Sequence, residues 1–377
     1  KTNFYMIKKI ATLILIASTS INAQERCGTE AITKRRMEIY PEYRIAREKV
    51  NVQTEQWIAN HPYYIEKTII TIPVVVHVVW NTSAQNISDA QIQSQIDVLN
   101  KDYRRTNIDE INTPNVWQAI AADCEIEFCL ATTDPNGQPT TGITRTQTTH
   151  GPFGMENDIH TSSLGGKDDW PNDDYLNIWV CNISSGLLGY ATPPSNWIGD
   201  GDGLVIGYRY FGTTGTLSPP YNKGRTATHE IGHWLNLEHL WGAWGSCGND
   251  QVSDTPKQET ENYSCPGFPL NINACSTTNA NGDMFMNYMD YTNDACMNLF
   301  TTGQKTRMLA AINQYRPNML SHNLCSGTTS ILETKSTKKE LVKIIDILGR
   351  ETNRQHSNTP LFYIYDDGSV EKKIIIE

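Results

Sequence analysis

The stretch His229-Glu230-Ile231-Gly232-His233, followed by His239, decides the fold and the chemistry of this chain. On a helix, His229 and His233 lie one turn apart on the same face, so both imidazoles can bind one zinc ion at about 2.0 to 2.1 Å. Glu230 lies beside them, where a carboxylate can take a proton from a water molecule at the metal and pass it on. The spacing therefore predicts a zinc helix that carries its own general base.

His239 imposes a turn after this helix. If the helix continued, His239 would lie about 9 Å further along the axis and about 120° away from His233, too far to share an ion. Asn236 stands where the chain has to turn, and Asn is the residue after Gly that best tolerates the left-handed conformation. The sequence thus predicts a helix that ends near Asn236 and returns His239 to the metal.

A second motif follows, Asn287-Tyr288-Met289-Asp290-Tyr291. The extended histidine motif with a later Met-turn is the pattern of metzincin metalloproteases. Within that clan the chain resembles the pappalysins, above all their secreted bacterial members, over about residues 61–325. The closer likeness is carried by Gly224-Arg225-Thr226-Ala227-Thr228, Cys247-Gly248-Asn249-Asp250, Val252-Ser253-Asp254-Thr255-Pro256, Met289-Asp290-Tyr291 and Asp294-Ala295-Cys296-Met297. The family usually has Gly at the position of Asn236.

The resemblance implies an α+β fold of the metzincin type. In that fold a twisted mixed sheet and the zinc helix lie above an irregular, disulfide-tied lower subdomain that contains the Met-turn. Met289 would form an apolar floor beneath the metal and not a ligand, because thioether sulfur binds zinc poorly beside imidazoles. Tyr291 matches the family's switch tyrosine, which stabilises the oxyanion. A packed aromatic side chain is the alternative for Tyr291.

Substrate choice and a second metal are also implied by the resemblance. Bacterial pappalysins similar to this chain prefer a basic residue just after the cut bond, and an Asp at the base of the pocket explains that preference through charge pairing. Asp294 is the candidate for this Asp, and Asp290 is the rival. The family binds calcium in the loop that holds Asp250, Asp254 and the Thr255 carbonyl, and oxygen ligands suit that ion. Ordinary solvated carboxylates are the alternative there.

Nine cysteines in an exported chain imply disulfides, and the number is odd. The resemblance implies two bridges near the active site, Cys247 with Cys275 and Cys265 with Cys296. Cys129 and Cys181 are either a pair or two buried thiols. The residues alone assign no partner to Cys124, Cys129, Cys181 or Cys325.

Residues 1–23 predict an export signal. Met6 is the expected start, followed by Lys8 and Lys9, the apolar stretch Ile10–Ala17 and a cleavage site at Ile21-Asn22-Ala23. An anchored N-terminal helix or a lipoprotein is the alternative reading of this segment.

Residues 24–60 predict a pro-segment that keeps the enzyme latent. Cys27 lies just after the signal, and a thiolate is a strong zinc ligand that can take the open position of a catalytic site. Pappalysin precursors with a comparable cysteine switch imply this role; a structural disulfide or a stray thiol is the alternative. The basic residues include four candidate processing sites, Arg35, Arg36, Arg44 and Arg47. A solvated amphipathic helix is the other reading of the segment.

Elsewhere the pattern alternates between strand and helix. His77 lies inside a strand, where a packed core histidine is expected and not a ligand. Ser88 and Gln91 predict a capping box at the start of one helix, and the last helix is expected at residues 303–315. The expected strands are residues 72–80, 125–132, 176–180 and 204–210.

The composition changes after Cys325. Residues 326–340 predict a linker, and residues 341–377 a small β unit with strands at 341–348, 361–366 and 369–376 and a hairpin turn at Asp367-Gly368. This unit resembles the C-terminal sorting tails of proteins exported by the type 9 system of Bacteroidetes. The resemblance implies the outer-membrane secretion machinery as a partner. A small accessory domain is the alternative.

Length and charge agree with an exported enzyme. A chain of 377 residues can form one large domain with appendages, and its net charge of -10 argues against nucleic acid as a partner. The sequence predicts a secreted zinc endopeptidase, acting on proteins or peptides and made as a latent precursor. The alternative is a surface-attached binding protein with a structural metal site. Glu230 favours the enzyme, because a structural zinc site is closed by protein ligands and needs no base.

Overall fold

The computed structural model describes residues 26–62, 69–155, 157–184, 186–195, 201–242, 247–272, 275, 279–321, 324–325, 341–352, 360–365 and 370–374. The chain divides into two compact units, residues 1–326 and 327–377. The expected export signal, the linker 326–340 and the turn at Asp367-Gly368 lie outside the described residues. Among the helices that are described, none is long and apolar enough to cross a membrane.

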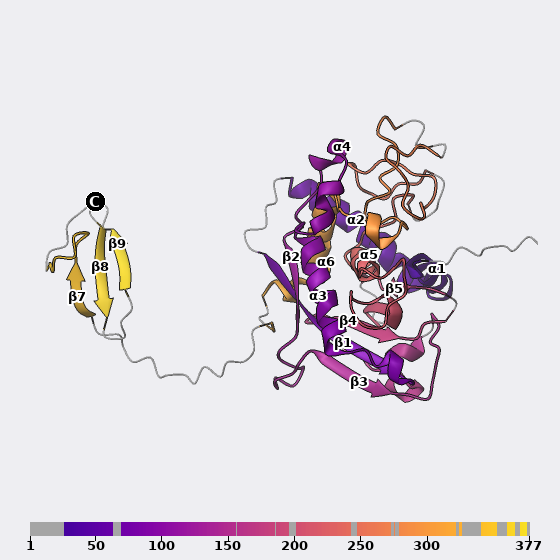
Figure 1. Cartoon of the computed structure of the whole chain (residues 1–377), viewed down its shortest axis with the longest axis horizontal. Coiled ribbons are helices and arrows are strands. Elements are labelled where there is room, and N and C mark those ends of the chain that lie inside the picture. Colours follow the sequence, from indigo (N-terminus) through magenta and orange to yellow (C-terminus); the bar gives the residue numbers. More distant parts are fainter. Residues whose placement is uncertain are drawn as a thin grey trace, which may run out of the picture. The chain divides into compact units, whose positions relative to one another are not determined.

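The larger unit is an α+β domain with one mixed sheet (Figure 1). Its helices are α1 (Thr29–Ile39), α2 (Pro41–Asn60), α3 (Asp89–Tyr103), α4 (Asn115–Gln118), α5 (Arg225–Trp234) and α6 (Thr302–Tyr315). Its strands are β1 (Ile70–Trp80), β2 (Ile126–Leu130), β3 (Ile143–Gln147), β4 (Leu176–Cys181), β5 (Gly189–Ala191) and β6 (Gly203–Gly207).

The sheet has the order β2-β1-β4-β6-β5, and β3 pairs with the second half of β1. All pairings are parallel except that of β5 with β6, so β5 is an antiparallel edge strand. Parallel sheets are buried on both faces, which explains the mostly apolar sequence of β1 and the fully buried β4. The edge strand β5 is also buried, and Gly189 of β5 forms a β-bridge with Cys27 of the N-terminal segment.

The two faces of β1 contribute to different parts of the core. Its even-numbered residues, such as Val74 and Val76, pack in the main core with residues of α3 and α5. On the other face, Val79 packs with Trp179 and with Ile32 of α1. His77 lies on this second face, fully buried, with its ring nitrogens 2.7 Å from the Thr144 hydroxyl and 3.0 Å from the Asn177 side-chain oxygen. The prediction that His77 is a packed side chain is confirmed.

Some expected boundaries were wrong. The strand expected at residues 204–210 ends at Gly207, because Tyr208–Tyr210 form a 3-10 turn. The strands β3 and β5 were not expected; β3 is polar and β5 has three residues, so neither carries an apolar pattern. Ser88 does cap Gln91 of α3, but the Gln91 side chain donates to the Tyr208 and Phe211 carbonyls instead of completing the capping box.

Between α5 and α6 the described residues are mostly irregular and form the loops drawn at the top of the larger unit in Figure 1. In Figure 1, α5 lies between the sheet and these loops, and α1 lies beside β5. The loops are tied by disulfides that join Cys247 to Cys275 and Cys265 to Cys296, the pairs that the resemblance implies. A third bridge, Cys129 to Cys325, answers the open question about Cys129.

Three described cysteines are free, and all are buried: Cys27, Cys124 and Cys181. Burial raises the pKa of the Cys124 and Cys181 thiols well above the usual range, so neither is an activated nucleophile. Neither of the two alternatives left open for Cys129 and Cys181 holds in full, because Cys129 is bonded to Cys325 while Cys181 is a buried thiol.

The smaller unit is a three-stranded antiparallel sheet in the order β7-β8-β9. Its strands are β7 (Leu341–Ile345), β8 (Pro360–Tyr365) and β9 (Val370–Ile374). β7 ends three residues earlier than expected and β8 begins one residue earlier, and β8 and β9 pair antiparallel as a hairpin requires. Leu361 and Tyr363 of β8 form its buried face.

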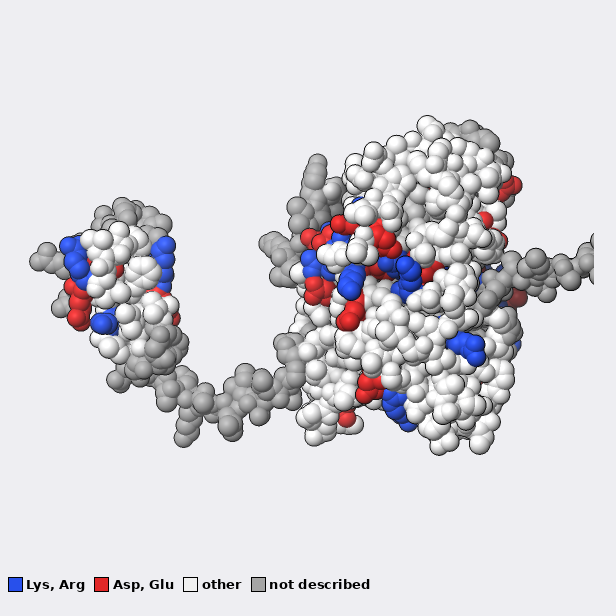
Figure 2. All heavy atoms as spheres, viewed as in Figure 1, with Lys and Arg blue, Asp and Glu red and all other residues white. Residues whose placement is uncertain are grey.

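On the face shown in Figure 2, basic and acidic side chains of the larger unit are intermixed, and no wide patch of one sign covers it. Ion pairs such as those that Arg104 makes with Asp123 and Glu127 belong to this mixed surface chemistry.

Candidate active site

Three imidazoles converge at the C-terminal end of α5. The Nε2 atom of His229 lies 3.2 Å from that of His233 and 3.2 Å from that of His239, and the last two Nε2 atoms lie 3.0 Å apart. A tetrahedral zinc ion with bonds of about 2.0 to 2.1 Å would hold its nitrogen ligands about 3.3 Å apart. The three side chains are buried, so the donor type, the spacing and the enclosure all fit zinc.

The other nitrogen of each ligand ring is already engaged. His229 Nδ1 donates to the Tyr288 carbonyl (2.6 Å), and His233 Nδ1 donates to the Leu237 carbonyl (2.8 Å). His239 Nδ1 lies 2.6 Å from Glu30 Oε1. A proton fixed on Nδ1 leaves the Nε2 lone pair for a metal. Burial lowers the pKa of His233 and of His239 to about 3, so neither ring competes for a second proton near neutral pH.

The turn that returns His239 is made at Asn236, as predicted. Asn236 has φ of 69°, and the Leu237 nitrogen donates to the Gly232 carbonyl, which closes the end of α5. The side chain of Asn236 is held from α2, because its Oδ1 accepts from Arg47 Nη1 (3.1 Å) and its Nδ2 donates to Thr54 Oγ1 (3.2 Å). This turn is therefore in contact with the expected pro-segment.

Glu230 lies beside the imidazole cluster, fully buried. Burial raises its pKa to about 7, a value suited to a group that must exchange a proton near neutral pH. Its Oε2 accepts from the Thr29 hydroxyl (2.8 Å) and from the Cys27 thiol (3.3 Å). Its Oε1 makes no hydrogen bond among the described residues. One oxygen of the candidate base is thus covered by residues 27–29.

Cys27 completes the cluster. One ligand atom from each of Cys27, His229, His233 and His239 lies within 4.8 Å of the others, and all four residues are buried. Residues 26–28 follow β5, since Gly28 N donates to the Gly189 carbonyl (2.9 Å) and Leu188 N donates to the Arg26 carbonyl (3.3 Å). Thr29 adds a third link, because its hydroxyl accepts from Ala191 N (2.8 Å).

The Met-turn lies beneath α5. Met289 is fully buried, and a side chain at Gly232 would collide with its Sδ, so the glycine of the histidine motif lets this floor approach the helix. Tyr291 lies on the other side of the cluster. Its ring contacts the rings of His229 and His239, with centroids 5.7 and 5.0 Å away, and its hydroxyl donates to the Cys27 carbonyl (3.4 Å).

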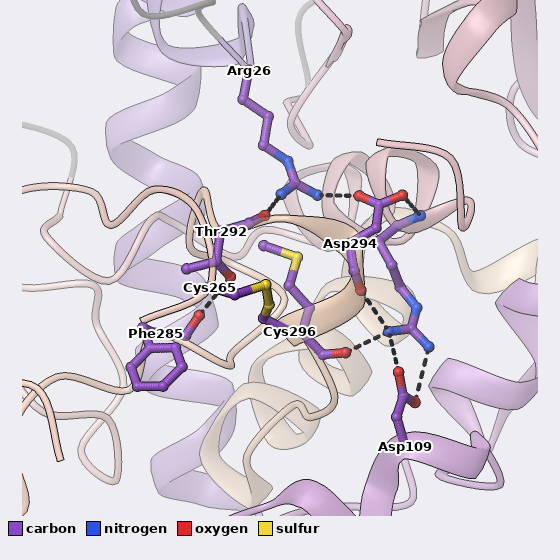
Figure 3. The surroundings of a disulfide bond; sticks show 9 residues. Arg26, Asp109, Cys265, Phe285, Thr292, Asp294 and Cys296 are labelled. Atoms are coloured by element: carbon purple, nitrogen blue, oxygen red, sulfur yellow. Dashed lines mark hydrogen bonds and ion pairs between the residues drawn. A yellow bond between two sulfur atoms is a disulfide. The ribbon is translucent and has the colours of Figure 1, made fainter. Parts of the chain in front are cut away.

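Asp294 meets a guanidinium from the N-terminal segment (Figure 3). Arg26 Nη2 lies 3.3 Å from Asp294 Oδ1, both side chains are fully buried, and Arg26 Nη1 donates to the Thr292 carbonyl. The guanidinium also lies over the ring of Tyr221, 5.2 Å from its centroid. Asp290 is directed elsewhere, because its carboxylate accepts from Gln258, Asn262 and the Tyr291 nitrogen.

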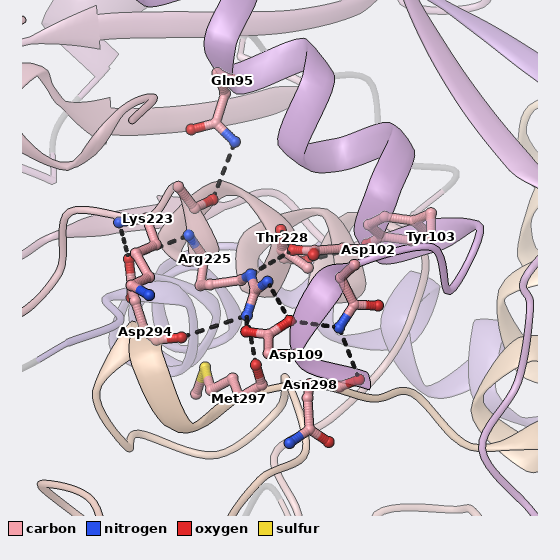
Figure 4. A network of polar contacts seen from close by, with 12 residues as sticks. Gln95, Asp102, Tyr103, Asp109, Lys223, Arg225, Thr228, Asp294, Met297 and Asn298 are labelled. Atoms are coloured by element: carbon pink, nitrogen blue, oxygen red, sulfur yellow. Dashed lines mark hydrogen bonds and ion pairs between the residues drawn. The ribbon is translucent and has the colours of Figure 1, made fainter. Parts of the chain in front are cut away.

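Arg225, the first residue of α5, connects the site to the rest of the domain (Figure 4). It pairs with Asp102 of α3 (2.8 Å) and with Asp109 (3.1 Å), and it donates to the carbonyls of Asp294 (3.3 Å) and Met297. The carboxylate of Asp294 in turn accepts from the Lys223 and Arg225 nitrogens. One buried cation therefore fixes both the start of the zinc helix and the segment that carries Asp294.

The loop expected to bind calcium brings only part of its residues together. Asp250 accepts from the Val252 nitrogen (3.1 Å) and from the Thr255 hydroxyl (2.6 Å). Asp254 instead accepts from the Thr301 hydroxyl (2.6 Å) and the Gly303 nitrogen (2.8 Å) at the start of α6. The carboxylates of Asp250 and Asp254 thus accept hydrogen bonds from different parts of the chain.

Sequence reasoning missed three residues of the site. Arg26, Thr29 and Glu30 contact Asp294, Glu230 and His239, yet in the sequence they are only polar residues around Cys27. For Arg26 the sequence did offer a signal, because its positive charge matches the negative charge of Asp294, which was predicted to lie in a pocket for basic side chains. Nothing in the sequence alone indicates the contact of Glu30 with the third histidine.

Comparisons with known proteins agree with this geometry. Residues 160–313 match the profile of the peptidase M43 family, described as pregnancy-associated plasma protein-A. An extracellular metalloprotease of Arthroderma otae is 31% identical over 253 residues, which cover 66% of this chain and 79% of that protein. An extracellular metalloprotease of Neurospora crassa is 27% identical over 326 residues, 84% of this chain and 98% of that protein.

Two solved structures from Tannerella forsythia are also similar. A promirolysin mutant has 48% identity and a TM-score of 0.71, and the match covers 78% of this chain and 97% of that one. Mature mirolysin in complex with a cleaved peptide has 52% identity and a TM-score of 0.64, with 68% and 97% covered. This chain therefore belongs to the pappalysin family, peptidase family M43, and is a zinc metalloendopeptidase.

Proposed function

We propose that the chain is the latent precursor of a secreted endopeptidase that cuts peptide bonds before arginine or lysine. The observation that carries this proposal concerns two residues that are adjacent in the sequence, Arg26 and Cys27. Cys27 lies with the three histidines, while Arg26 lies against Asp294. In this proposal residues 24–60 are the pro-segment, 61–325 the catalytic domain, 326–340 a linker and 341–377 a sorting unit.

Latency follows from what residues 26–29 cover. The Cys27 sulfur and the ligand nitrogens of the three histidines lie within 4.8 Å of one another, which supports Cys27 as a fourth ligand, and a thiolate binds zinc more strongly than water does. Thr29 holds one oxygen of Glu230, the residue proposed as general base. The backbone of residues 26–28 pairs with β5, the sheet edge on which an extended peptide can dock. All three obstacles leave together when the pro-segment departs.

After release, the residues of the chain have distinct roles. A zinc ion held by His229, His233 and His239 would supply Lewis-acid polarisation of the scissile carbonyl and of the attacking water. Glu230 takes a proton from that water and delivers it to the leaving amine. Tyr291, freed from the Cys27 carbonyl, donates a hydrogen bond from its hydroxyl to the developing oxyanion. The edge of β5 aligns the peptide backbone.

Specificity for a basic residue is supported by Arg26. Its guanidinium occupies a buried position between Asp294, the Thr292 carbonyl and the ring of Tyr221. A buried carboxylate favours a cationic side chain strongly, since an apolar one would leave the charge unpaired. An arginine or lysine of the substrate would take the place of Arg26. This favours Asp294 over Asp290, whose oxygens are already engaged.

Self-processing follows from the same preference, but not at every expected arginine. Arg44 is exposed on α2, with its side chain 53% accessible. Arg47 is buried against Asn236 and the Pro194 carbonyl, so it is not an accessible cut site while α2 is in place. Arg44 is therefore the better candidate of the two.

Secretion is supported by the names of similar proteins, by the disulfides and by the segments 1–23 and 341–377. Similar fungal proteins are named extracellular metalloproteases, and the chain carries three disulfides, which form in oxidising compartments. Residues 1–23 fit an export signal, and the resemblance of residues 341–377 to type 9 sorting tails suggests export through the outer membrane. We also propose a structural calcium ion beside Asp250 and Thr255, with Asp254 as a less favourable ligand.

A surface binding protein with a structural metal site is the alternative. Four protein ligands would close such a site permanently, and Cys27 does complete a set of four. Glu230 argues against that reading, because a buried carboxylate with a pKa of about 7 beside a closed structural site would only destabilise it. The fourth ligand also comes from a segment that precedes the catalytic domain.

Purified precursor and Cys27→Ala precursor provide the test, with chelator-sensitive cleavage of Arg-containing peptides as the measurement. We expect the wild-type precursor to be inactive until its pro-segment is cut, and Cys27→Ala to be active at once. A Ser184→Ala variant, altered at a part-buried hydroxyl away from the cluster, serves as the matched control. Latency would be refuted if the uncut wild-type precursor cut these peptides as fast as the uncut Cys27→Ala precursor.

A further inference from the structure

The three imidazoles of the metal cluster differ in the partner of their Nδ1 atom. His229 and His233 donate to carbonyls of Tyr288 and Leu237, which belong to the catalytic domain itself. His239 alone is bonded to a residue of the pro-segment, with its Nδ1 2.6 Å from Glu30 Oε1. Departure of the pro-segment therefore leaves two ligand rings supported and removes the partner of the third.

We propose that Glu30 is a positioning residue for the zinc ligand His239, so that the latent precursor binds zinc more tightly than the matured enzyme does. The proposal rests on the proposed role of residues 24–60 as a removable pro-segment. It gives that segment a second task besides covering the site: it completes the metal centre while the protein folds and is exported.

The geometry suits this task. Glu30 lies in the first turn of α1, and α1 is held against β5 through Gly28 and Thr29, so the carboxylate approaches His239 from a fixed helix. The His239 ring is stacked on Trp241, with centroids 4.4 Å apart and an angle of 15°. Stacking fixes the ring plane, and the carboxylate fixes the ring's rotation and its tautomer.

The chemical effect of such a partner is well defined. A carboxylate that accepts from Nδ1–H increases the basicity of Nε2, and loss of such a partner typically costs about 10- to 100-fold in metal affinity. A backbone carbonyl, as used by His229 and His233, fixes the ring without adding a negative charge. The Glu30 carboxylate and the Cys27 thiolate therefore both bring negative charge to a dication, and both leave together.

The test uses the full-chain precursor and measures metal binding, not activity. Zinc affinity is determined by competition with a chromogenic chelator for wild type, Glu30→Ala, Glu30→Gln and Glu38→Gln. Glu38 is the matched control, because it is an exposed carboxylate near the other end of the same helix, α1. We expect a loss of at least 10-fold for Glu30→Ala, a smaller loss for Glu30→Gln and no change for Glu38→Gln.

Cobalt substitution separates the proposed role from simple anchoring of the pro-segment. Cobalt bound to a thiolate has a charge-transfer absorption band, which reports whether Cys27 is still on the metal. A lower affinity of Glu30→Ala with the band retained supports the proposal. An affinity within twofold of wild type overturns it, and so does a lower affinity with the band lost, since Glu30 would then act only by holding Cys27 in place. If wild type itself lacks the band, the latency proposal fails, independently of Glu30.

Discussion

Arg26 and Asp294 are 268 positions apart in the sequence, yet they form a fully buried ion pair with Nη2 3.3 Å from Oδ1. Two buried charges repay their loss of water only when they are paired and hydrogen-bonded. Here the Asp294 carboxylate also accepts from two backbone nitrogens, those of Lys223 and Arg225. Asp294 therefore offers a buried counter-charge to one cationic side chain, here that of Arg26, the residue before Cys27.

Substitution of Asp294 tests this counter-charge. In the matured enzyme we expect Asp294→Asn to lower kcat/KM for substrates with arginine after the cut bond by about 30-fold or more, because a desolvated cation loses its counter-charge, a loss of at least about 2 kcal/mol. Peptides with leucine at that position, assayed in parallel, should be affected little. The assignment of the pocket to Asp294 is wrong if both peptide classes lose activity equally.

The turn at Asn236 gives a second prediction. Glycine adopts the φ of 69° without strain, so Asn236→Gly should keep the path of the chain from His233 to His239. It removes the side chain that Arg47 and Thr54 contact from α2. We expect the variant precursor to lose its pro-segment about tenfold faster, measured as the time course of cleavage on a gel.

Thr54→Val is the companion variant, because it weakens the same contact from the other side and leaves the turn unchanged. It should accelerate release in the same direction by a smaller factor. Unaltered release in both variants would show that α2 adds nothing to latency beyond the contacts of residues 26–30.

Arg225 is expected to matter for stability. Arg225→Met leaves the buried Asp102 and the partly exposed Asp109 without their cation, and removal of one partner of a buried ion pair costs about 3 to 5 kcal/mol. Urea unfolding of the variant should show a free energy of unfolding lower by that amount. The double variant Arg225→Met with Asp102→Asn should regain part of this lost free energy of unfolding. If the two residues did not interact, the losses of the two single variants would instead add.

Buried histidines predict a loss of stability in acid. Burial lowers the pKa of His77 to about 4 and that of His160 to about 3, below the usual value near 6.5. As the pH falls, these histidines are protonated in the unfolded chain before they are protonated in the folded protein. Their contribution to the free energy of unfolding is therefore complete above pH 6.5 and is lost as the pH drops toward 4. Each ring contributes on the order of 3 kcal/mol to this loss.

His160→Phe removes one of these titrating groups and keeps a ring against Trp179. We expect its free energy of unfolding to decline less steeply between pH 6.5 and 4 than that of wild type. Parallel curves for wild type and His160→Phe would contradict the prediction.

Much of the site could be predicted from the sequence, because it is local. The spacing of His229, Glu230 and His233 determines one helix face, and the turn at Asn236 is required by His239. The apolar run of β1 predicts a buried strand by its composition alone. In each case the residues that interact are close in the chain or carry a pattern of their own.

The missed features are contacts between distant segments. β5 has three residues and becomes a strand only through its pairing with β6, so no local pattern marks it. The bond from Cys129 to Cys325 joins cysteines 196 positions apart. Arg26, Thr29 and Glu30 acquire their roles only when the N-terminal segment follows β5 past the histidines. Sequence spacing contains no information on such docking.

We expect three histidines and Glu230 to act together as a zinc-dependent hydrolytic site. The measurement is cleavage of a mixed peptide library by matured wild type and by Glu230→Ala, each with zinc content determined, before and after chelation. We expect chelator-sensitive cutting before arginine or lysine by wild type, restored by zinc, and no cutting by Glu230→Ala although it still binds one zinc per chain. Undiminished cutting by Glu230→Ala, or by the chelated wild type, would contradict this expectation.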